Sequence, residues 1–485
     1  MSEEDRSTEY GGDRPLVAVA GDSGFALRDT ARWLHRRVER ISHTERLMIR
    51  RRVSVDFTIP PGLPPFRTGE AGPNAPNIYF VPVALLRKWP PLMEFDLRAE
   101  DGRPIPLLTS HKNREVDAAA LVDLAPAGNE RDCMEPLLKN VAESDPVGAE
   151  KALQAVGTFL AGKWASLSLV DQRGWARTVR VAGSLVRNSI LWVRVEAAPG
   201  DRQLIKFAYM EPAPRELFLH RRILAAFSWA PRRAWYELPN LGERASYHLE
   251  IEAPPDLAIY SARLELSDLP PRDMTQRPRR LRIARPLKNV FKRLWAGAAS
   301  RRNELFGVAS EGATTEPKHL RPAKPGEPYV WNARERAYLY VVGSQDQYGA
   351  ASVDMGIGTR ALITSSLRAS LVITALLGFL WQVPGAVGNH ADGAIALLII
   401  FPPLLALLVF RSGEHPMMRQ LISGVRFLLV LAAVLPVIDA AAVLGFAHPT
   451  ASDLRTPFLI VFLLALLVSL LLVASWLLPP ADNDY

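Results

Sequence analysis

One carboxylate of this sequence lies inside an apolar stretch, where an ionisable side chain is costly. Asp439 stands in Leu435–Ala442, within the third of four apolar runs near the end of the chain. Ionisable residues at such depth usually face a helix-bundle interior or water, and they mark ion or proton paths in transporters. Gln382, at similar depth in the first run, is a candidate partner. The two residues form a candidate intramembrane functional site.

The simpler interpretation of Asp439 is structural. A polar contact between packed helices, or a side chain that reaches outward to the membrane surface, would explain it. A transport path normally needs several convergent polar groups, whereas here one carboxylate stands without an intramembrane base. We therefore favour the structural interpretation.

A second candidate is a basic amphipathic helix in Pro286–Ala298. Its apolar side chains share one helical face, and its Lys and Arg residues take the others. A helix of this kind beside a membrane domain can lie on the anionic inner leaflet of a bilayer. A helix docked on the soluble region, or a disordered basic linker, would give the same pattern. The residues expected to contact the membrane surface are Lys288, Phe291, Lys292, Arg293, Leu294 and Trp295.

Three short matches to catalytic or nucleotide-binding motifs fail on their context. Gly21–Gly24 copies a serine-protease nucleophile loop, but no barrel precedes it to supply His and Asp. Gly157–Lys163 resembles a phosphate-binding loop, but Trp164 stands where Ser or Thr would hold Mg²⁺. Gly356–Ala361 resembles a dinucleotide fingerprint, but the helix after it is a candidate membrane span. We predict no catalytic, cofactor-binding or metal site, and no cofactor.

Histidine and cysteine usage adds no further signature. The nine histidines are scattered, and the single cysteine excludes an intrachain disulfide and fits a cytosolic chain. An enzyme whose site is built from inconspicuous residues stays an alternative. Its candidate residues, which the sequence does not rank, are Asp56, Asp96, His111 and His248.

The elements that would hold these residues begin with four apolar runs. Each run reaches roughly 27–33 Å as a helix, which matches the hydrocarbon thickness of a bilayer. We therefore predict a four-helix transmembrane domain over 361–485. The runs are about Ala369–Gly388, Gly393–Phe410, Val425–Phe446 and Pro457–Leu478.

Positive charge around these runs predicts their direction. Five arginines flank the side that carries the soluble region, against Arg455 alone on the other side. By the positive-inside rule the soluble region, and both chain termini, face the cytosol of a multi-pass plasma-membrane protein. Met1–Gly24 lacks the apolar core of a signal peptide. The five arginines are Arg360, Arg368, Arg411, Arg419 and Arg426.

The soluble region is rich in strand patterns. Val53–Ile59 alternates apolar and polar residues, as a half-buried strand does. Met93–Leu97 and Ile105–Leu108 predict a hairpin, and Tyr247–Ile251 predicts a strand paired with Leu257–Leu266. The fold class is therefore α+β, with a β-rich, sandwich-like cytosolic domain before the transmembrane helices.

The expected domain boundaries follow from composition. An N-terminal tail with an Arg-rich helix (Trp33, Leu34, Val38 and Ile41 on one face) occupies 1–46. The β-rich domain covers 47–270 with a helical insertion at about 115–170, and its last strands return at 329–360. Between them, 271–328 is a basic linker. The excess positive charge of the chain is confined to that linker, which argues against nucleic acid as a partner.

Four segments resemble a group of uncharacterised actinobacterial membrane proteins. They are Phe80–Lys88, Phe95–Thr109, Tyr247–Leu257 and Gly413–Pro416. The resemblance covers about 45–478 and implies the same layout, with a soluble β-rich region first and four helices last. It implies no activity, cofactor or catalytic residue.

These features support three functional hypotheses. The leading one is a non-enzymatic membrane protein whose cytosolic β-domain works as a sensor, adaptor or scaffold for a protein partner. The first alternative is a small transporter or channel subunit, in which Asp439 lies in the path of an oligomeric bundle. The second is a membrane-bound enzyme without a recognisable motif.

Overall fold

The fold is taken from a computed structural model of the 485-residue chain. The described residues are 26–27, 30–44, 47–60, 62–66, 77–88, 92–214, 219–238, 244–267, 329–333, 335–344, 348–357, 361–383, 396, 399–400, 415–445 and 451–477.

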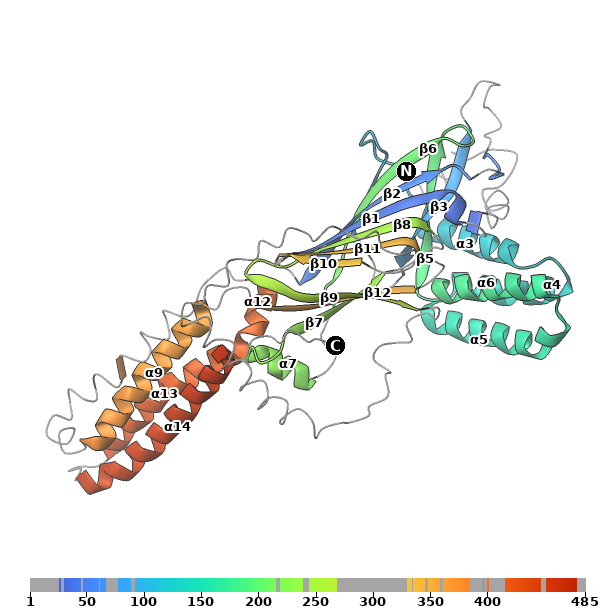
Figure 1. Cartoon of the computed structure of the whole chain (residues 1–485). Helices are drawn as coiled ribbons and strands as arrows, with labels where there is room; N and C mark the ends of the chain where they lie inside the picture. The colour runs from blue at the N-terminus through green and yellow to red at the C-terminus, as the bar shows by residue number, and fades with distance from the viewer. Residues whose placement is uncertain are drawn as a thin grey trace, which may run out of the picture.

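A seven-stranded sheet forms the long axis of the β-rich region (Figure 1). In order across the sheet its strands are β10 (Tyr329–Ala333), β11 (Arg336–Ser344), β8 (Arg244–Glu252), β1 (Leu34–His43), β2 (Met48–Thr58), β6 (Arg202–Pro212) and β4 (Met93–Arg98). β1 and β8 are parallel, and the other neighbours are antiparallel.

The prediction of an Arg-rich helix near the N-terminus is wrong, because those residues form the central strand β1. Along β1 the side chains of Arg37, Glu39 and Ile41 are buried while Arg36 is exposed, so the period is two. Charged residues occupy two of the buried positions. A pattern that counts only apolar residues as buried therefore misses the alternation.

Two smaller sheets face the large one. Their strands are β7 (Arg232–Leu238), β12 (Tyr348–Ile357) and β9 (Leu257–Ser267) in the first, and β3 (Ile78–Arg87) with β5 (Asn188–Glu196) in the second. One apolar core joins side chains such as Leu249 of the large sheet to Val353 of the first small sheet. Another core joins Val55 of the large sheet to Val81 and Val193 of the second. One part of the large sheet therefore packs against the first small sheet, and another part packs against the second.

Four helices cover the second small sheet at the end opposite the membrane helices (Figure 1). They are α3 (Ser110–Leu124), α4 (Asn129–Glu143), α5 (Pro146–Lys163) and α6 (Leu169–Leu185). Their shared core includes Trp175 and Leu121, together with Phe80 of β3 and Trp192 of β5. The helical segment is longer than the expected 115–170, since α3 and α6 extend it at both ends.

The expected hairpin that starts from Met93–Leu97 is present in a short form. After the turn at Asp101-Gly102, Arg98 bridges to Pro104 and the Ile105 N–H donates to the Leu97 carbonyl at 3.0 Å, while the main partner of β4 is β6. The expected pairing of Tyr247–Ile251 with Leu257–Leu266 is wrong, because β9 pairs with β12 and β8 lies between β1 and β11. Long-range contacts decide that pairing, although the two segments are adjacent in sequence.

Three long apolar helices, rather than four, are present in the described part of the chain. They are α9 (Ala361–Gln382), α13 (Ser423–Gly445) and α14 (Ala451–Leu477). Most of the second expected run, about 393–410, lies outside the described residues. Each of the three is long and apolar enough to cross a membrane. They expose large apolar side chains, including Phe379, Phe427 and Leu444, on a surface suited to lipid.

The first candidate membrane helix starts earlier than the apolar run predicted. The candidate span begins at Ile363 and includes Ser366 and Ser370. Both serines are buried, and the Ser370 hydroxyl lies 2.7 Å from that of Ser469 in α14. Thr374 bonds the same Ser469 hydroxyl at 2.8 Å. Polar residues near the start of the predicted run therefore form contacts between helices.

Candidate functional site: a buried charge network and a cationic pocket

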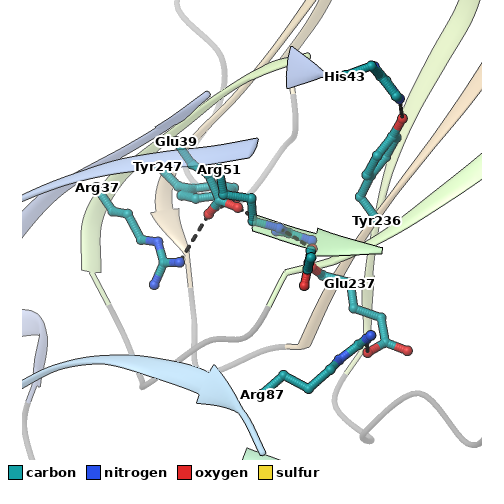
Figure 2. A network of polar contacts seen from close by, with 9 residues as sticks. Arg37, Glu39, His43, Arg51, Arg87, Tyr236, Glu237 and Tyr247 are labelled. Carbon is teal, nitrogen blue, oxygen red and sulfur yellow. Dashed lines mark hydrogen bonds and ion pairs between the residues drawn. The ribbon is translucent and has the colours of Figure 1, made fainter. Parts of the chain in front are cut away.

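Four charged side chains are buried on the inner face of the large sheet (Figure 2). Arg51 of β2 donates to Glu39 of β1 and to Glu211 of β6, each at 2.5 Å. Arg37 donates to the other Glu39 oxygen at 3.0 Å, and the Tyr247 hydroxyl donates to that oxygen at 3.1 Å. Two arginines thus neutralise two glutamates. The balance matters because an unpaired buried charge is strongly unfavourable.

The electrostatics of the network follow from this pairing. Burial alone raises the pKa of Glu39, but the charges of Arg51 and Arg37 and their hydrogen bonds outweigh it and bring that pKa to about 2. Glu39 is therefore ionised throughout the physiological range. Both of its oxygens accept hydrogen bonds, one from Arg51 and the other from Arg37 and Tyr247, so Glu39 acts as a structural counterion.

The network lies where the large sheet changes partners. Arg51 also donates to the backbone carbonyl of Glu237 in β7 at 3.0 Å. The Glu237 carboxylate in turn pairs with Arg87 at the end of β3. Figure 2 shows these side chains in succession from β2 to β3. The ion pairs therefore connect both small sheets to the large one across the boundary between the two apolar cores.

A histidine links the same region to the membrane side. His43, at the end of β1, donates from Nδ1 to the Glu252 carbonyl at 2.9 Å, and its Nε2 accepts from the Tyr236 hydroxyl at 2.9 Å. Burial lowers the pKa of His43 to about 4, so the ring is neutral at neutral pH. The next residue, Thr44, accepts through its carbonyl from His415 Nε2 at 2.9 Å.

His415 caps a short helix that leads into the bundle of apolar helices. This helix, α12 (Pro416–Leu421), immediately precedes α13. The His415 ring accepts from the Met417 backbone N–H at 3.2 Å. Residues of α12, together with one residue of α9 and the residue between α12 and α13, belong to the same apolar core as the first small sheet. These residues are Ile363, Met417, Met418, Leu421 and Ile422.

Polar contacts reinforce this junction. Arg232, at the start of β7, donates to the Gln420 side chain of α12 at 2.6 Å. Trp229 follows α7 (Leu219–Ala226) and donates through its indole N–H to Ser475 of α14 at 2.9 Å. The β-rich region is therefore held against the bundle at α12 and at the end of α14 (Figure 1).

At the other end of the β-rich region, a pocket of about 570 Å³ opens between β3, β5, α3 and the α4–α5 turn. Its walls are mainly apolar, from side chains such as Phe95, Leu107 and Trp192. Lys88 and Arg114 contribute positive charge, and Arg87 of the charge network also lines it. A concave, mostly apolar site with a few placed polar groups is the usual form of a small-molecule site.

A buried carboxylate lies behind one wall of the pocket. Asp117 of α3 accepts from the Trp192 indole at 2.8 Å and from the Ile190 backbone N–H at 3.3 Å. Asn113, which lines the pocket, also donates to it at 3.3 Å. Burial raises the pKa of Asp117 to about 7 despite these donors. Sequence reasoning missed this residue because it stands in a helix with no local motif.

The two predicted intramembrane residues do not meet. Asp439 of α13 is fully buried, and neither of its carboxylate oxygens has a hydrogen-bond partner in the described part of the chain. Gln382 is exposed at the end of α9. The expected pairing is therefore absent from the described residues. The hydrogen bonds of Ser370, Thr374 and Ser469 are the polar helix contacts that the structure provides instead.

The four unranked enzyme candidates do not form a site. Asp56 pairs with Arg202, Asp96 pairs with Arg98, and His111 lies on the surface beside Glu115. His248 packs its ring against Tyr340 on the outer face of the large sheet. Among the described residues, no group of three His, Cys, Asp or Glu side chains could hold a metal ion.

The predicted membrane-surface residues lie outside the described residues. Pro286–Ala298, with Lys288, Trp295 and their neighbours, belongs to the segment between β9 and β10. Their contact with lipid stays a prediction.

No protein-family model matches the chain, and a comparison with curated proteins finds no similar sequence. The resemblance to actinobacterial membrane proteins therefore gains no support from known families. The layout that it implied holds in its coarser form, a β-rich region followed by apolar helices that could contact a bilayer.

Proposed function

We propose that this chain is a multi-pass plasma-membrane protein whose cytosolic β-rich region works as a sensor or adaptor. In this role a ligand or protein partner acts on the β-rich region, and the membrane helices receive the change. No chemical step is required of it.

The observation that carries the proposal is the shared core at α12. A passive anchor needs only a tether between the soluble part and the first span. Here Met417 and Ile422 are fully buried in the core that also holds β7, β9 and β12. Because packed cores resist continuous deformation, a shift of these strands would be passed to α12 and α13.

The path of the chain favours four crossings. α9 leads away from the β-rich region, whereas α12 packs against it (Figure 1). The apolar run at about 393–410, most of it outside the described residues, is long enough for a further crossing between these helices. Arg368, Arg419 and Arg426 belong to the bundle end near the β-rich region and Arg455 to the far end, which favours the cytosolic orientation.

Orientation can be tested with the native cysteine. Cys133 is exposed on α4, so a membrane-impermeant maleimide should label it in broken cells and leave it unlabelled in intact ones. A Cys133→Ser, Ser452→Cys variant should give the opposite result, because Ser452 is exposed at the far end of the bundle. Labelling of Cys133 in intact cells would contradict the cytosolic placement.

Transmission across the junction can be tested by hydrogen–deuterium exchange of the full chain in nanodiscs. The Glu39→Gln change perturbs the buried network, and we expect faster exchange in α12 and the first turn of α13. Glu94→Gln, an exposed glutamate on the large sheet, is the matched control and should leave α12 unchanged. If α12 exchanged at the wild-type rate in both variants, the coupling that a sensor needs would be absent.

A transporter or channel subunit is the second candidate function, and Asp439 is the observation that favours it. A fully buried carboxylate without a hydrogen-bond partner among the described residues is expensive, and such groups are usually retained for function. Its partner in that case would be an ion, a proton or a polar group of a neighbouring subunit.

A further inference from the structure

We infer that the pocket between β3, β5 and α3 binds a small amphipathic anion, with a carboxylate or phosphate head and an apolar body. This inference deepens the proposed function, since the ligand would be the input of the sensor. Binding is a property of the pocket by itself, however, and it can be measured without any signalling readout.

The apolar part of the ligand follows from the walls. Phe95 and Leu107 line the pocket beside Trp192, whose indole N–H is already bonded to Asp117. Leu107 is also about half exposed, at 48%. A volume of about 570 Å³ lies within the usual range for small-molecule sites. The space and its surface therefore suit a compact apolar or aromatic group.

The anionic head follows from the cations, above all Lys88. Its ammonium group is half-buried, and it donates one hydrogen bond, to the Ala142 carbonyl at 2.8 Å. An ammonium group has three N–H donors, and no carboxylate lies within ion-pair distance of this one among the described residues. Burial lowers the pKa of Lys88, and the charge of Asp117 behind the wall offsets this only in part. An anion in the pocket would supply the missing partner.

Neighbouring groups add to the positive potential. Arg114 and Arg87 line the same pocket, against one carboxylate, Asp145. Asp145 accepts from the Gly148 backbone N–H at 2.7 Å as the cap of α5, so one of its oxygens is already engaged. The first turn of α3, which begins at Ser110, also lines the pocket and carries the positive end of the helix dipole.

A ligand at this place would contact the charge network directly. Arg87 lines the pocket and pairs with the Glu237 carboxylate, while the Glu237 carbonyl accepts from Arg51. An anionic head that competed for Arg87 would weaken its pair with Glu237. Through β7 the change would reach Tyr236, His43 and then α12.

The test is calorimetric titration of the full chain in nanodiscs with phenyl phosphate and with benzoate. We expect saturable binding of one or both anions, and binding weaker by about 10-fold or more for inorganic phosphate, benzamide and benzylammonium. Lys88→Met should weaken anion binding by about 10-fold or more. Lys112→Met, an exposed lysine on α3 outside the pocket, is the matched control and should bind as the wild type does.

Arg114→Gln is a second test variant for the case in which Lys88→Met does not fold. Because Arg114 is exposed, its replacement should leave the fold intact and should also weaken anion binding. The inference fails if neither anion binds saturably, or if Lys88→Met and Arg114→Gln both bind like the wild type. Binding without any change in the exchange of α12 would overturn the sensor function and leave the ligand site standing. Coupling through Glu39→Gln without anion binding would overturn the ligand site alone.

Discussion

Buried charges at the boundary between two cores are the most informative residues of this protein. Arg51 satisfies Glu39, Glu211 and a backbone carbonyl of β7 at once. Removing one member of such a network leaves a neighbouring charge with fewer partners, or with none, in a dry interior. That loss is much larger than the net value of the ion pairs themselves.

Replacing Glu39 by Gln should therefore destabilise the β-rich region by about 3–5 kcal/mol, because Arg37 would lose its carboxylate partner and Arg51 would keep only Glu211. The midpoint of thermal unfolding of the full chain in micelles should fall clearly. Glu94→Gln removes a carboxylate that is 59% exposed and should change the midpoint little. Equal midpoints for the two variants would show that the buried network is not essential to the fold.

A second residue-scale prediction concerns pH. The pKa of Asp117 is about 7 in the folded chain against 3.8 for a free side chain, so the folded state retains a proton that the unfolded state releases. The stabilisation is complete below about pH 4 and is lost as pH rises to about 7, by up to about 1.4 kcal/mol for each pH unit. Asp117→Asn should flatten this dependence.

The measurement for Asp117 is hydrogen exchange in α3 and β5 at about pH 5 and about pH 8, corrected for the intrinsic exchange rate. Protection in the wild type should be weaker at the higher pH. An Asp117→Asn chain with the same pH dependence as the wild type would refute the assignment to this carboxyl.

At the scale of elements, the junction depends on a close approach of α7 to α13. A Cβ atom added at Gly424 would lie 2.8 Å from the Ala226 carbonyl oxygen and 2.8 Å from the Phe227 ring. The glycine therefore allows the first turn of α13 to rest on the end of α7. The short helix α12 and the contact between Trp229 and Ser475 complete the same junction.

Gly424→Ala should consequently push α7 away from α13 and speed hydrogen exchange in α7 and α12. Gly157→Ala in α5 is the matched control, since its new Cβ would meet nothing within 4 Å. That change should stabilise α5 by about 0.5–1 kcal/mol, as Ala usually does in a helix interior. Unaltered exchange in α7 and α12 for Gly424→Ala would mean that the junction tolerates the separation.

At the scale of the whole molecule, a β-rich region and a bundle of apolar helices share one chain. The charge network, His43 and His415 form a continuous series of contacts from the pocket side to α12. The bundle beyond it is held by apolar packing and by the hydroxyl contacts of Ser370 and Ser469. Asp439 has a hydrogen bond to neither region among the described residues.

The two candidate functions differ in what they require of Asp439. In a sensor or adaptor, Asp439→Asn should leave coupling between the β-rich region and α12 at its wild-type level. In a transporter or channel subunit, the same change should abolish proton or cation flux into vesicles that contain the full chain, because the titratable site is lost. Ser469→Ala, which removes a buried hydroxyl from the same bundle, is the control and should retain any flux. A flux that depends on Asp439 would contradict the sensor function and support the transporter function.

The sequence alone determined the features that depend on local pattern. Apolar runs long enough to cross a bilayer predicted α9, α13 and α14, and period-two alternation predicted strands such as β2 and β8. Positions on a buried face, and positions suited to lipid, are occupied mainly by apolar residues, because the free energy of transfer from water depends mainly on side-chain polarity. The α+β class and the order of the two regions follow from these patterns.

Tertiary structure decided what long-range contacts control. The residues of β1 match a helical pattern as long as Arg37 and Glu39 are taken as exposed. In the folded chain both are buried, because Arg51 and Glu211 from neighbouring strands complete the ion pairs that charges need inside a core. The pocket beside Lys88, the partner of β9 and the junction at α12 likewise depend on residues far apart in sequence. No local pattern encodes such pairings, so the candidate site became visible only once the chain was folded.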